Sequence, residues 1–153
     1  MGRVRTAAKA LIERDGRLLL THCRDHRGEW YALPGGGQEE GEPLEATIVR
    51  ECREEIGTEV TVLGLRHVRD YIIANHSFSY LDEAVHQVEH LFACRVPDDY
   101  VPQNGPGADR AQVGVVWLDA AALARVRVYP ALLRDWIDPA RRAALPVYWG
   151  DVE

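Results

Sequence analysis

The sequence has no long apolar run, and its N-terminal residues lack the pattern of a secretory leader, so we expect neither a membrane protein nor a secreted one. Although 46% of its 153 residues are hydrophobic, no apolar stretch approaches the roughly 20 residues that a membrane-spanning helix needs. The N-terminal residues carry charges and lack the apolar centre of a signal peptide. We therefore expect a soluble cytoplasmic protein with no membrane partner, folded as one domain over residues 1–153.

Positive charge is also scarce. Lys and Arg together number 18 against 24 Asp and Glu, so the net charge is −6. This balance argues against duplex DNA as a partner, because binding to a phosphate backbone needs a basic surface. A small phosphate ligand stays possible, since a divalent cation can supply local positive charge. Lysine occurs once against 17 arginines, which we interpret as compositional bias without functional content.

Cysteine is too rare, and too irregularly spaced, for a structural framework. Cys23, Cys52 and Cys94 fit neither the spacing of a zinc site nor a set of disulfides. Free cysteine usually behaves as a small buried hydrophobic residue. We therefore expect Cys52 and Cys94 to lie in the core.

Hydrophobic patterning predicts a mixed α/β chain. A helix is expected from Pro43 to Gly57, because proline suits the first turn of a helix and glycine the position just after it. Asp119 is expected to cap a helix to about Arg125. Strands are predicted over residues 7–12, 17–22, 30–33, 59–73, 85–96 and 113–118, loops over 24–30, 74–83 and 97–112, and a helix over 129–137. Strands around a central helix, with further helices late in the chain, indicate an α/β/α sandwich with a mixed central sheet between helices.

The segment 36–58, GGQEEGEPLEATIVRECREEIGT, carries the strongest chemical signal. Glu51, Glu54 and Glu55 are spaced i, i+3 and i+4, which places them on one face of a helix. Three adjacent carboxylates repel one another, and their hard oxygen atoms suit Mg²⁺ or Mn²⁺. On helix spacing alone, a solvated acidic face paired with Arg50 and Arg53 is the alternative.

The same segment resembles the Nudix box, G-x5-E-x7-R-E-U-x-E-E-x-G-U, where U is bulky and apolar. All seven fixed positions match: Gly36, Glu42, Arg50, Glu51, Glu54, Glu55 and Gly57. Two U positions depart, Cys52 and Thr58, and we interpret both as packing variations. The resemblance to this MutT-like family implies a Nudix-type α/β/α sandwich in a single Nudix hydrolase domain.

The resemblance also implies roles for the box residues. Glu51, Glu54 and Glu55 would be catalytic and would hold Mg²⁺ or Mn²⁺, with the backbone carbonyl of Gly35 as a further ligand. Arg50 and Glu42 would orient these carboxylates from outside the metal's own ligands. Surface ion pairs are the alternative for the last two residues.

The general base stays open between Glu54, Glu89 and Asp109. Glu89 lies in a strand after the box, where many Nudix enzymes place another acidic ligand or base; the alternative is an outward-facing strand residue. His86 and His90 are further candidates, although a polar sheet face explains them equally well.

Substrate contacts are expected just before the box. Arg24 and Arg27 suit a terminal phosphate, and Trp30 suits stacking on a base. A place in the core or at its rim is the alternative for Trp30 and Tyr31. A homodimer is a further hypothesis, through the apolar residues of 126–149, of which Tyr129, Trp136, Tyr148 and Trp149 are the aromatic members.

The implied activity is metal-dependent hydrolysis of a diphosphate bond in a nucleoside diphosphate linked to another moiety. The substrate would be a small nucleotide: a nucleoside triphosphate, an oxidised nucleotide, a nucleotide sugar or an ADP-ribose type molecule. The family's subgroup markers are missing, since Ile73 and Ala74 replace a proline and Asn75 and His76 a tyrosine. A catalytically idle nucleotide sensor and a pyrophosphohydrolase for capped RNA remain the alternatives.

Overall fold

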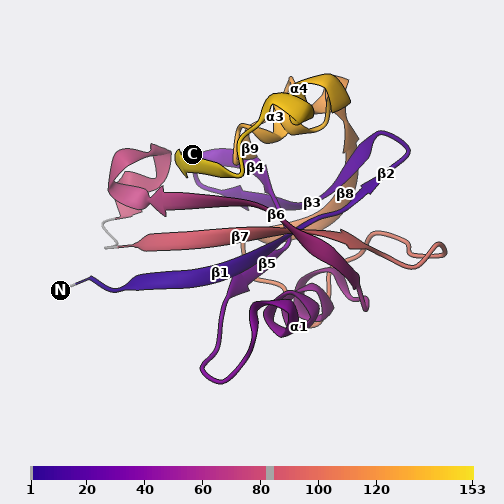
Figure 1. Ribbon diagram of the computed structural model, residues 1–153, viewed down its shortest axis with the longest axis horizontal. Helices are drawn as coiled ribbons and strands as arrows, with labels where there is room; N and C mark the ends of the chain where they lie inside the picture. The colour runs from indigo at the N-terminus through magenta and orange to yellow at the C-terminus, as the bar shows by residue number, and fades with distance from the viewer. Residues whose placement is uncertain (1, 82–84) are drawn as a thin grey trace.

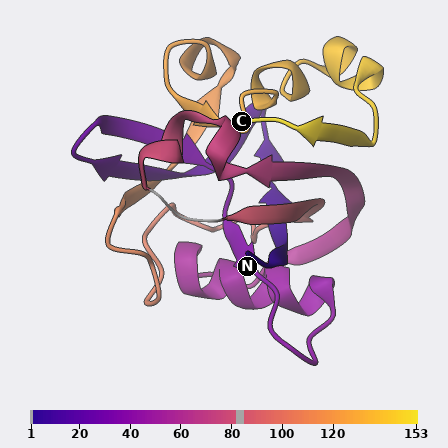
Figure 2. The ribbon, with the colours of Figure 1, turned by 90° about the vertical axis from the view of Figure 1, so that its left-hand side faces the viewer.

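The computed structural model describes residues 2–81 and 85–153, which fold into three layers (Figure 1). Helix α1 (Leu44–Ile56) covers one side of the β-structure, and α3 (Leu133–Trp136) and α4 (Pro139–Ala144) lie on the other. Figure 2 shows the same layering from the side. The predicted α/β/α sandwich is therefore confirmed, with the β-layer divided between two mixed sheets.

The first sheet contains both the glycine-rich strand that precedes the box and the strand that holds Glu89. Its order is β10 (Tyr148–Asp151), β6 (Thr61–Ile72), β7 (His86–Arg95), β1 (Val4–Leu11) and β5 (Gly35–Gly37). Strand β1 runs parallel to β7 and antiparallel to β5, so it joins the glycine-rich strand before the box to the strand that holds Glu89.

The second sheet is built on β3 (Arg17–Asp25), which pairs with β2 (Glu13–Arg14), β4 (Gly28–Ala32) and β8 (Gln112–Asp119). Strand β9 (Val128–Tyr129) adds to β4 in parallel. The prediction of a loop over residues 24–30 is wrong, because β3 and β4 continue through it as a hairpin. The polar composition of this segment resembles that of a loop, but Arg24 and Glu29 pair across the two strands on an exposed surface.

Helix α1 begins one residue later than the proline rule predicts, with Pro43 at the N-cap. It ends as predicted at Gly57, whose φ of 69° is the left-handed conformation that glycine adopts without strain. Asp119 caps α2 (Ala120–Leu123), which is shorter than expected. The helix predicted over 129–137 is reduced to α3, because Val128 and Tyr129 pair with β4.

Two 3₁₀ turns, η1 (Ile73–Asn75) and η2 (Ser77–Leu81), occupy most of the segment predicted as a loop over 74–83. Residues 82–83 of that prediction lie outside the described chain. In the part of the chain that is described, no helix combines the length and the apolar composition needed to cross a membrane.

The core has two parts, one under α1 and one under α3. Ile48, Cys52 and Ile56 of α1 pack into the first part with Cys94, which confirms the core positions predicted for both cysteines. Trp136 and Trp149 are buried in the second part. They were expected to be exposed at a dimer interface, and that expectation is wrong for both: the apolar face of α3 packs inward. The homodimer itself stays a prediction.

The connection over residues 97–112 fastens the end of α1. Gly105 N donates to Glu55 O at 2.9 Å, and Gly107 N donates to Glu54 O at 2.8 Å. A Cβ at Gly105 would lie 2.3 Å from the carbonyl oxygen of Glu54, so only glycine allows this approach. The connection thus supplies donors to helix-end carbonyls that α1 itself leaves unpaired.

Candidate active site

Arg50 is the centre of the box and joins its carboxylates. It holds Glu42 in a two-pronged contact, with Nε 2.8 Å from Oε2 and Nη2 2.9 Å from Oε1. Nη1 donates to Glu51 at 2.9 Å and lies 3.5 Å from Glu54, and Nη2 also donates to Gly37 O at 2.9 Å. We call Glu42, Arg50, Glu51, Glu54 and Glu55 the box cluster.

Glu42 is fixed as an anion within this cluster. Hydrogen bonds from Arg50, from the hydroxyl of Thr47 at 2.7 Å and from Glu39 N lower the pKa of Glu42 to about 2. The same contact with Glu42 raises the pKa of Arg50. The pair is therefore charged throughout the physiological range, and it anchors the guanidinium that Glu51 and Glu54 share.

Glu55 has a different environment from the other box carboxylates. Burial raises its pKa to about 7, against the lowering effects of the Lys9 charge and of a hydrogen bond from Gly35 N. That hydrogen bond is 2.6 Å long. A carboxyl group that is this poorly solvated gains from a nearby cation, because the cation offsets the cost of keeping it ionised.

The glycines before the box let the backbone approach these side chains closely. Gly35 has a φ of 140°, and a Cβ there would lie 2.1 Å from Ala8 O. A Cβ at Gly36 would lie 2.7 Å from the carboxyl carbon of Glu51. Gly35 therefore cannot accommodate a side chain, and a side chain at Gly36 would displace the Glu51 carboxylate, so β5 brings its peptide groups directly against the box cluster.

Glu89 lies on β7 and is buried, with 3% of its surface exposed. The alternative of an outward-facing strand residue is therefore wrong. Arg69 Nε donates to Glu89 Oε1 at 2.9 Å and Gln87 Nε2 to Oε2 at 2.9 Å. Burial alone would raise the pKa of Glu89, but the charges of Lys9 and Arg69 hold it below its ordinary value.

Two cations of the site were not found from the sequence, Lys9 and Arg69. Lys9 Nζ donates to Gly35 O at 3.2 Å, next to the peptide N–H that Glu55 binds. A single charged residue inside the apolar run AAKALI was the available signal for Lys9. Arg69 is 5% exposed, and its pairing with Glu89 depends on the register of β6 against β7, which leaves no local pattern.

The predicted substrate residues lie on the β3–β4 hairpin. Arg24 Nη2 binds Glu29 at 2.5 Å, and Arg27 Nη1 donates to Ser77 O at 3.3 Å. Trp30 meets Phe78 edge to face, with ring centroids 5.3 Å apart. All three belong to the rim of the second sheet, and their role in substrate binding stays a prediction.

The remaining base candidates are engaged elsewhere. Asp109 is exposed and accepts from Ala111 N at 2.8 Å within the 97–112 connection. His86 pairs with Asp70 at 2.7 Å. His90 Nδ1 lies 3.2 Å from a backbone carbonyl of β1. Glu89 differs from these candidates because it is a buried carboxylate on the face of β7 that it shares with Lys9 of β1.

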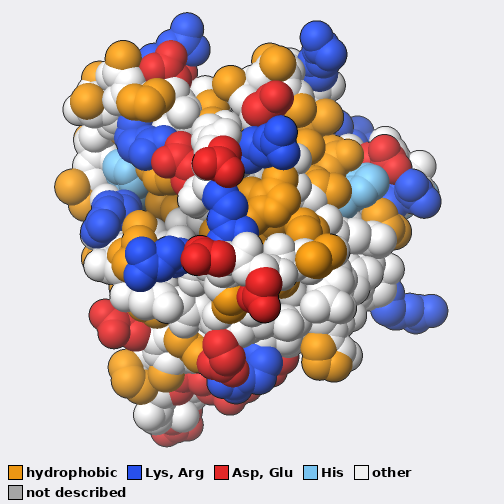
Figure 3. Space-filling model, turned by 90° about the vertical axis from the view of Figure 1, so that its right-hand side faces the viewer, with side chains coloured by type: hydrophobic (Ala, Val, Ile, Leu, Met, Phe, Trp, Pro, Cys, Tyr) orange, Lys and Arg blue, Asp and Glu red, His pale blue; other side chains and the backbone are white. Residues whose placement is uncertain are grey.

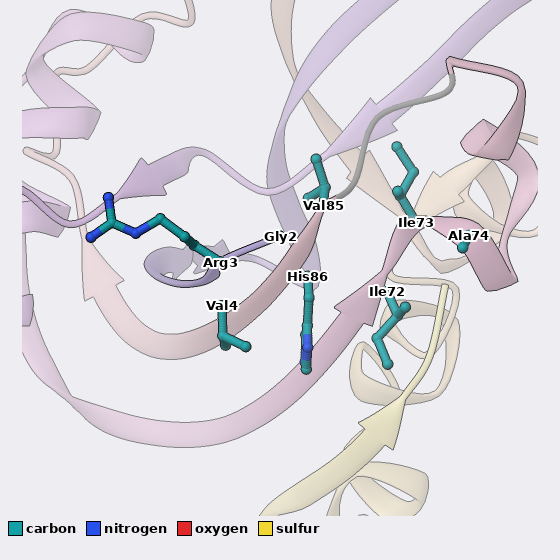
Figure 4. Close-up of a pocket in the computed structure, with 8 residues that line it drawn as sticks. All are labelled: Gly2, Arg3, Val4, Ile72, Ile73, Ala74, Val85 and His86. Atoms are coloured by element: carbon teal, nitrogen blue, oxygen red, sulfur yellow. The ribbon is translucent and has the colours of Figure 1, made fainter.

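An apolar pocket of about 240 Å³ lies at the ends of β1, β6 and β7 (Figure 4). Residues 2–4, 72–74, Val85 and His86 line it. None of these lining residues belongs to the box cluster, so this pocket is separate from the carboxylates. A more polar hollow of about 500 Å³ adjoins the box and is lined by Thr6 and residues 38–43.

The box donors suit a divalent metal in kind. Within residues 2–81 and 85–153, no three His, Cys, Asp or Glu side chains are grouped closely enough to hold a metal as they stand. Glu51 and Glu54 turn to Arg50, and Glu55 turns to Gly35 N. Carboxylate and carbonyl oxygens are nevertheless the hard ligands that Mg²⁺ and Mn²⁺ select. The donor set therefore fits such a cation once these side chains turn from their present partners.

Comparison of the sequence with models of protein families identifies the family to which the chain belongs. The model of the NUDIX domain matches residues 2–138, which is most of the chain. The chain belongs to the Nudix family. It is a Nudix hydrolase, and the family predicted from residues 36–58 is confirmed.

Relatives of this Nudix hydrolase include the nucleoside triphosphatase NudI of Salmonella agona, 34% identical over 97 residues, which cover 60% of this chain and 69% of that protein. A Nudix hydrolase of Nitrosomonas europaea has the same fold, with a TM-score of 0.69 and 19% identity over 95% of this chain and 93% of the other. A UDP-X diphosphatase also shares the fold, with a TM-score of 0.69 and 17% identity over 99% of this chain and 68% of the other.

Proposed function

We propose that this Nudix hydrolase cleaves a diphosphate bond of a small nucleotide with the aid of Mg²⁺ or Mn²⁺. The observation that carries the proposal is the box cluster, in which one arginine is shared by three carboxylates and a fourth, Glu55, is desolvated. Such an excess of buried or half-buried negative charge calls for a cation.

Glu51, Glu54, Glu55 and the carbonyl of Gly35 would hold the metal. When bound, the metal neutralises charge on the phosphoryl oxygens and lowers the pKa of a bound water. Arg50, fixed by Glu42, would keep Glu51 and Glu54 close together until the metal binds. Glu54 and Glu89 are the proposed proton acceptors, and Glu89 is kept ionised by Arg69 and Lys9.

Nucleoside triphosphates are the substrate class proposed first, including oxidised ones. The support is the 34% identity to proteins that are named nucleoside triphosphatases. Nucleotide sugars come second, because the likeness to a UDP-X diphosphatase is one of fold.

Surface charge favours a small substrate over RNA. On the face in Figure 3, arginine side chains are interspersed with Asp and Glu, so this face is a poor path for a sugar–phosphate backbone. The net charge of −6 points the same way. Capped RNA is therefore included in the test as the competing substrate.

The test is a screen for hydrolysis with Mg²⁺ or Mn²⁺, in which substrate and phosphorylated products are separated by anion-exchange chromatography. The panel holds nucleoside triphosphates, oxidised nucleotides, nucleotide sugars, ADP-ribose, dinucleoside polyphosphates and capped RNA. Glu54→Gln is the inactive variant, and Glu45→Gln, exposed in the first turn of the same helix, is the matched control. Turnover of nucleoside triphosphates by wild type and control alone supports the proposal. Binding of nucleotide without turnover of any substrate would replace it with the idle-sensor function.

A further inference from the structure

Lys9 occupies an unusual place for a lysine. It is the only lysine of the chain and lies between the fully buried Ala8 and Ala10 on β1. Its ammonium group donates to the carbonyl oxygen of Gly35 at 3.2 Å. That oxygen is the backbone atom assigned above to the metal, so an ammonium group and a metal ion have the same ligand.

Strand register places Lys9 beside the second acidic residue of the site. Lys9 lies directly opposite Gly35 on β5 and Leu91 on β7, and Ala7 lies opposite Glu89. Directly opposed residues of neighbouring strands point to the same face, and so do residues two apart on one strand. Lys9 and Glu89 therefore share a face as diagonal neighbours.

Glu55 reaches the same peptide from the helix. Its carboxylate accepts from Gly35 N at 2.6 Å, while Lys9 holds Gly35 O. The charge of Lys9 lowers the pKa of both Glu55 and Glu89. One ammonium group thus compensates two carboxylates that come from different elements.

We propose that the Lys9 ammonium is the internal counter-ion of this site in the metal-free protein, and that a divalent cation replaces it at the Gly35 carbonyl. The proposal rests on the proposed function, which supplies the metal. Loading is then an exchange of cations, in which Lys9 leaves Gly35 O as the metal binds. Lys9 is a positioning residue: it holds the Gly35 carbonyl and offsets the charges of Glu55 and Glu89 in the metal-free protein, and it weakens metal binding by competing for the site.

The first test is calorimetric titration of nucleotide-free protein with Mn²⁺ at about pH 8, where ordinary carboxylates are ionised. We expect Lys9→Met to bind Mn²⁺ about tenfold more tightly than wild type, because a neighbouring cation changes the binding of a positive charge to a carboxylate by about one logarithmic unit or more. Arg95→Met, on the exposed end of β7, is the matched control and should bind as wild type does. Equal or weaker binding by Lys9→Met overturns the proposal.

The second test uses unmutated protein, so it does not depend on the variant folding. A single lysine gives a single signal when the protein is labelled with [¹³Cε]lysine. We expect this signal to shift during titration with Mg²⁺ and to follow metal saturation. A signal that stays in place while Mg²⁺ binds overturns the exchange and leaves the hydrolase proposal intact. Wild type that binds neither metal, with or without nucleotide, overturns both proposals.

Discussion

Two groups of carboxylates in this molecule differ in how completely they are paired. We call Asp151 of β10 and Glu153, two residues further on, the β10 cluster. Asp151 accepts hydrogen bonds from Ile72 N at 3.0 Å, Asn75 Nδ2 at 2.8 Å and His76 Nε2 at 2.7 Å. Glu153 accepts from Ser77 N at 2.7 Å. Burial would raise the pKa of Asp151, but these donors lower it to about 2.

In the box cluster the donors are too few for the acceptors. Glu51 and Glu54 share the Nη1 group of Arg50, and Glu55 relies on one peptide N–H and has a pKa of about 7. The fully paired carboxylates hold η1 and η2 to the C-terminal strand, which is a structural task. The under-paired carboxylates retain binding capacity for a cation. The difference teaches that acidity alone does not mark a site; the shortage of donors does.

The largest expected effect comes from removing one charge of the box cluster. Glu54→Gln should lower turnover about 100-fold or more, since losing even a residue that supports a metal ligand costs about 10–100-fold. Initial rates with nucleoside triphosphate and Mg²⁺ measure the effect, beside Glu45→Gln as the control on the same helix. A similar loss in both variants would mean that the effect is general to the helix.

Arg50→Met should affect both stability and rate. It leaves Glu42 and Glu51 without their main donor, which costs about 1–3 kcal/mol in the free energy of unfolding. Turnover should fall about 10–100-fold. Arg53→Met is the matched control, because Arg53 pairs with Glu59 at 2.5 Å on the exposed surface of the same helix. Urea unfolding and initial rates give both quantities, and unchanged stability in Arg50→Met would contradict the account.

Asp151→Asn tests whether the β10 cluster has a structural role and no catalytic one. Loss of the charged acceptor for Ile72, Asn75 and His76 should lower the free energy of unfolding by about 1–2 kcal/mol. Turnover should stay within about twofold of wild type, because a structural substitution away from the reacting groups acts through stability. A loss of rate as large as that of Glu54→Gln would show that the two clusters share one function.

The β10 cluster also predicts how stability depends on pH. Asp151 has a folded pKa of about 2 and an ordinary value of 3.8, so its contribution is complete above pH 3.8 and is lost as the pH falls toward 2. The stability difference between wild type and Asp151→Asn should therefore shrink over that interval. Urea unfolding at a series of pH values measures it, and a difference that stays constant down to pH 2 would refute the pairing.

The smallest effect concerns Arg24, an expected phosphate contact. Its pair with Glu29 is exposed, so Arg24→Met should change stability by less than about 1 kcal/mol. If Arg24 binds substrate, KM should rise while kcat is kept. The Glu29→Gln variant is the control, since it breaks the same pair without removing the arginine. Equal KM values in wild type and Arg24→Met would remove Arg24 from the substrate site.

The box was readable from the sequence because its geometry is local. Glu51, Glu54 and Glu55 belong to one helix, so their spacing fixes their face, and Gly57 marks the helix end by its conformation. Cys52 and Cys94 were placed in the core by residue type and pattern alone. In each case a few neighbouring residues contain the information.

Contacts between strands could not be read in this way. Lys9, Glu89 and Gly35 meet through the register of three strands that are far apart in the chain, and Arg69 joins them from a fourth. The scarcity of lysine was interpreted as compositional bias, whereas the one lysine lies against the proposed metal ligand. The burial of Trp136 and Trp149 likewise depends on how α3 and β10 pack, which residue type does not reveal.

The most direct test of the difference between the two clusters is equilibrium binding of Mg²⁺ to three proteins: wild type, Glu54→Gln and Asp151→Asn. The account predicts that wild type and Asp151→Asn bind Mg²⁺ with similar affinity and that Glu54→Gln binds it at least about tenfold more weakly. Equal affinity in all three proteins would contradict the assignment of the box cluster as the cation site.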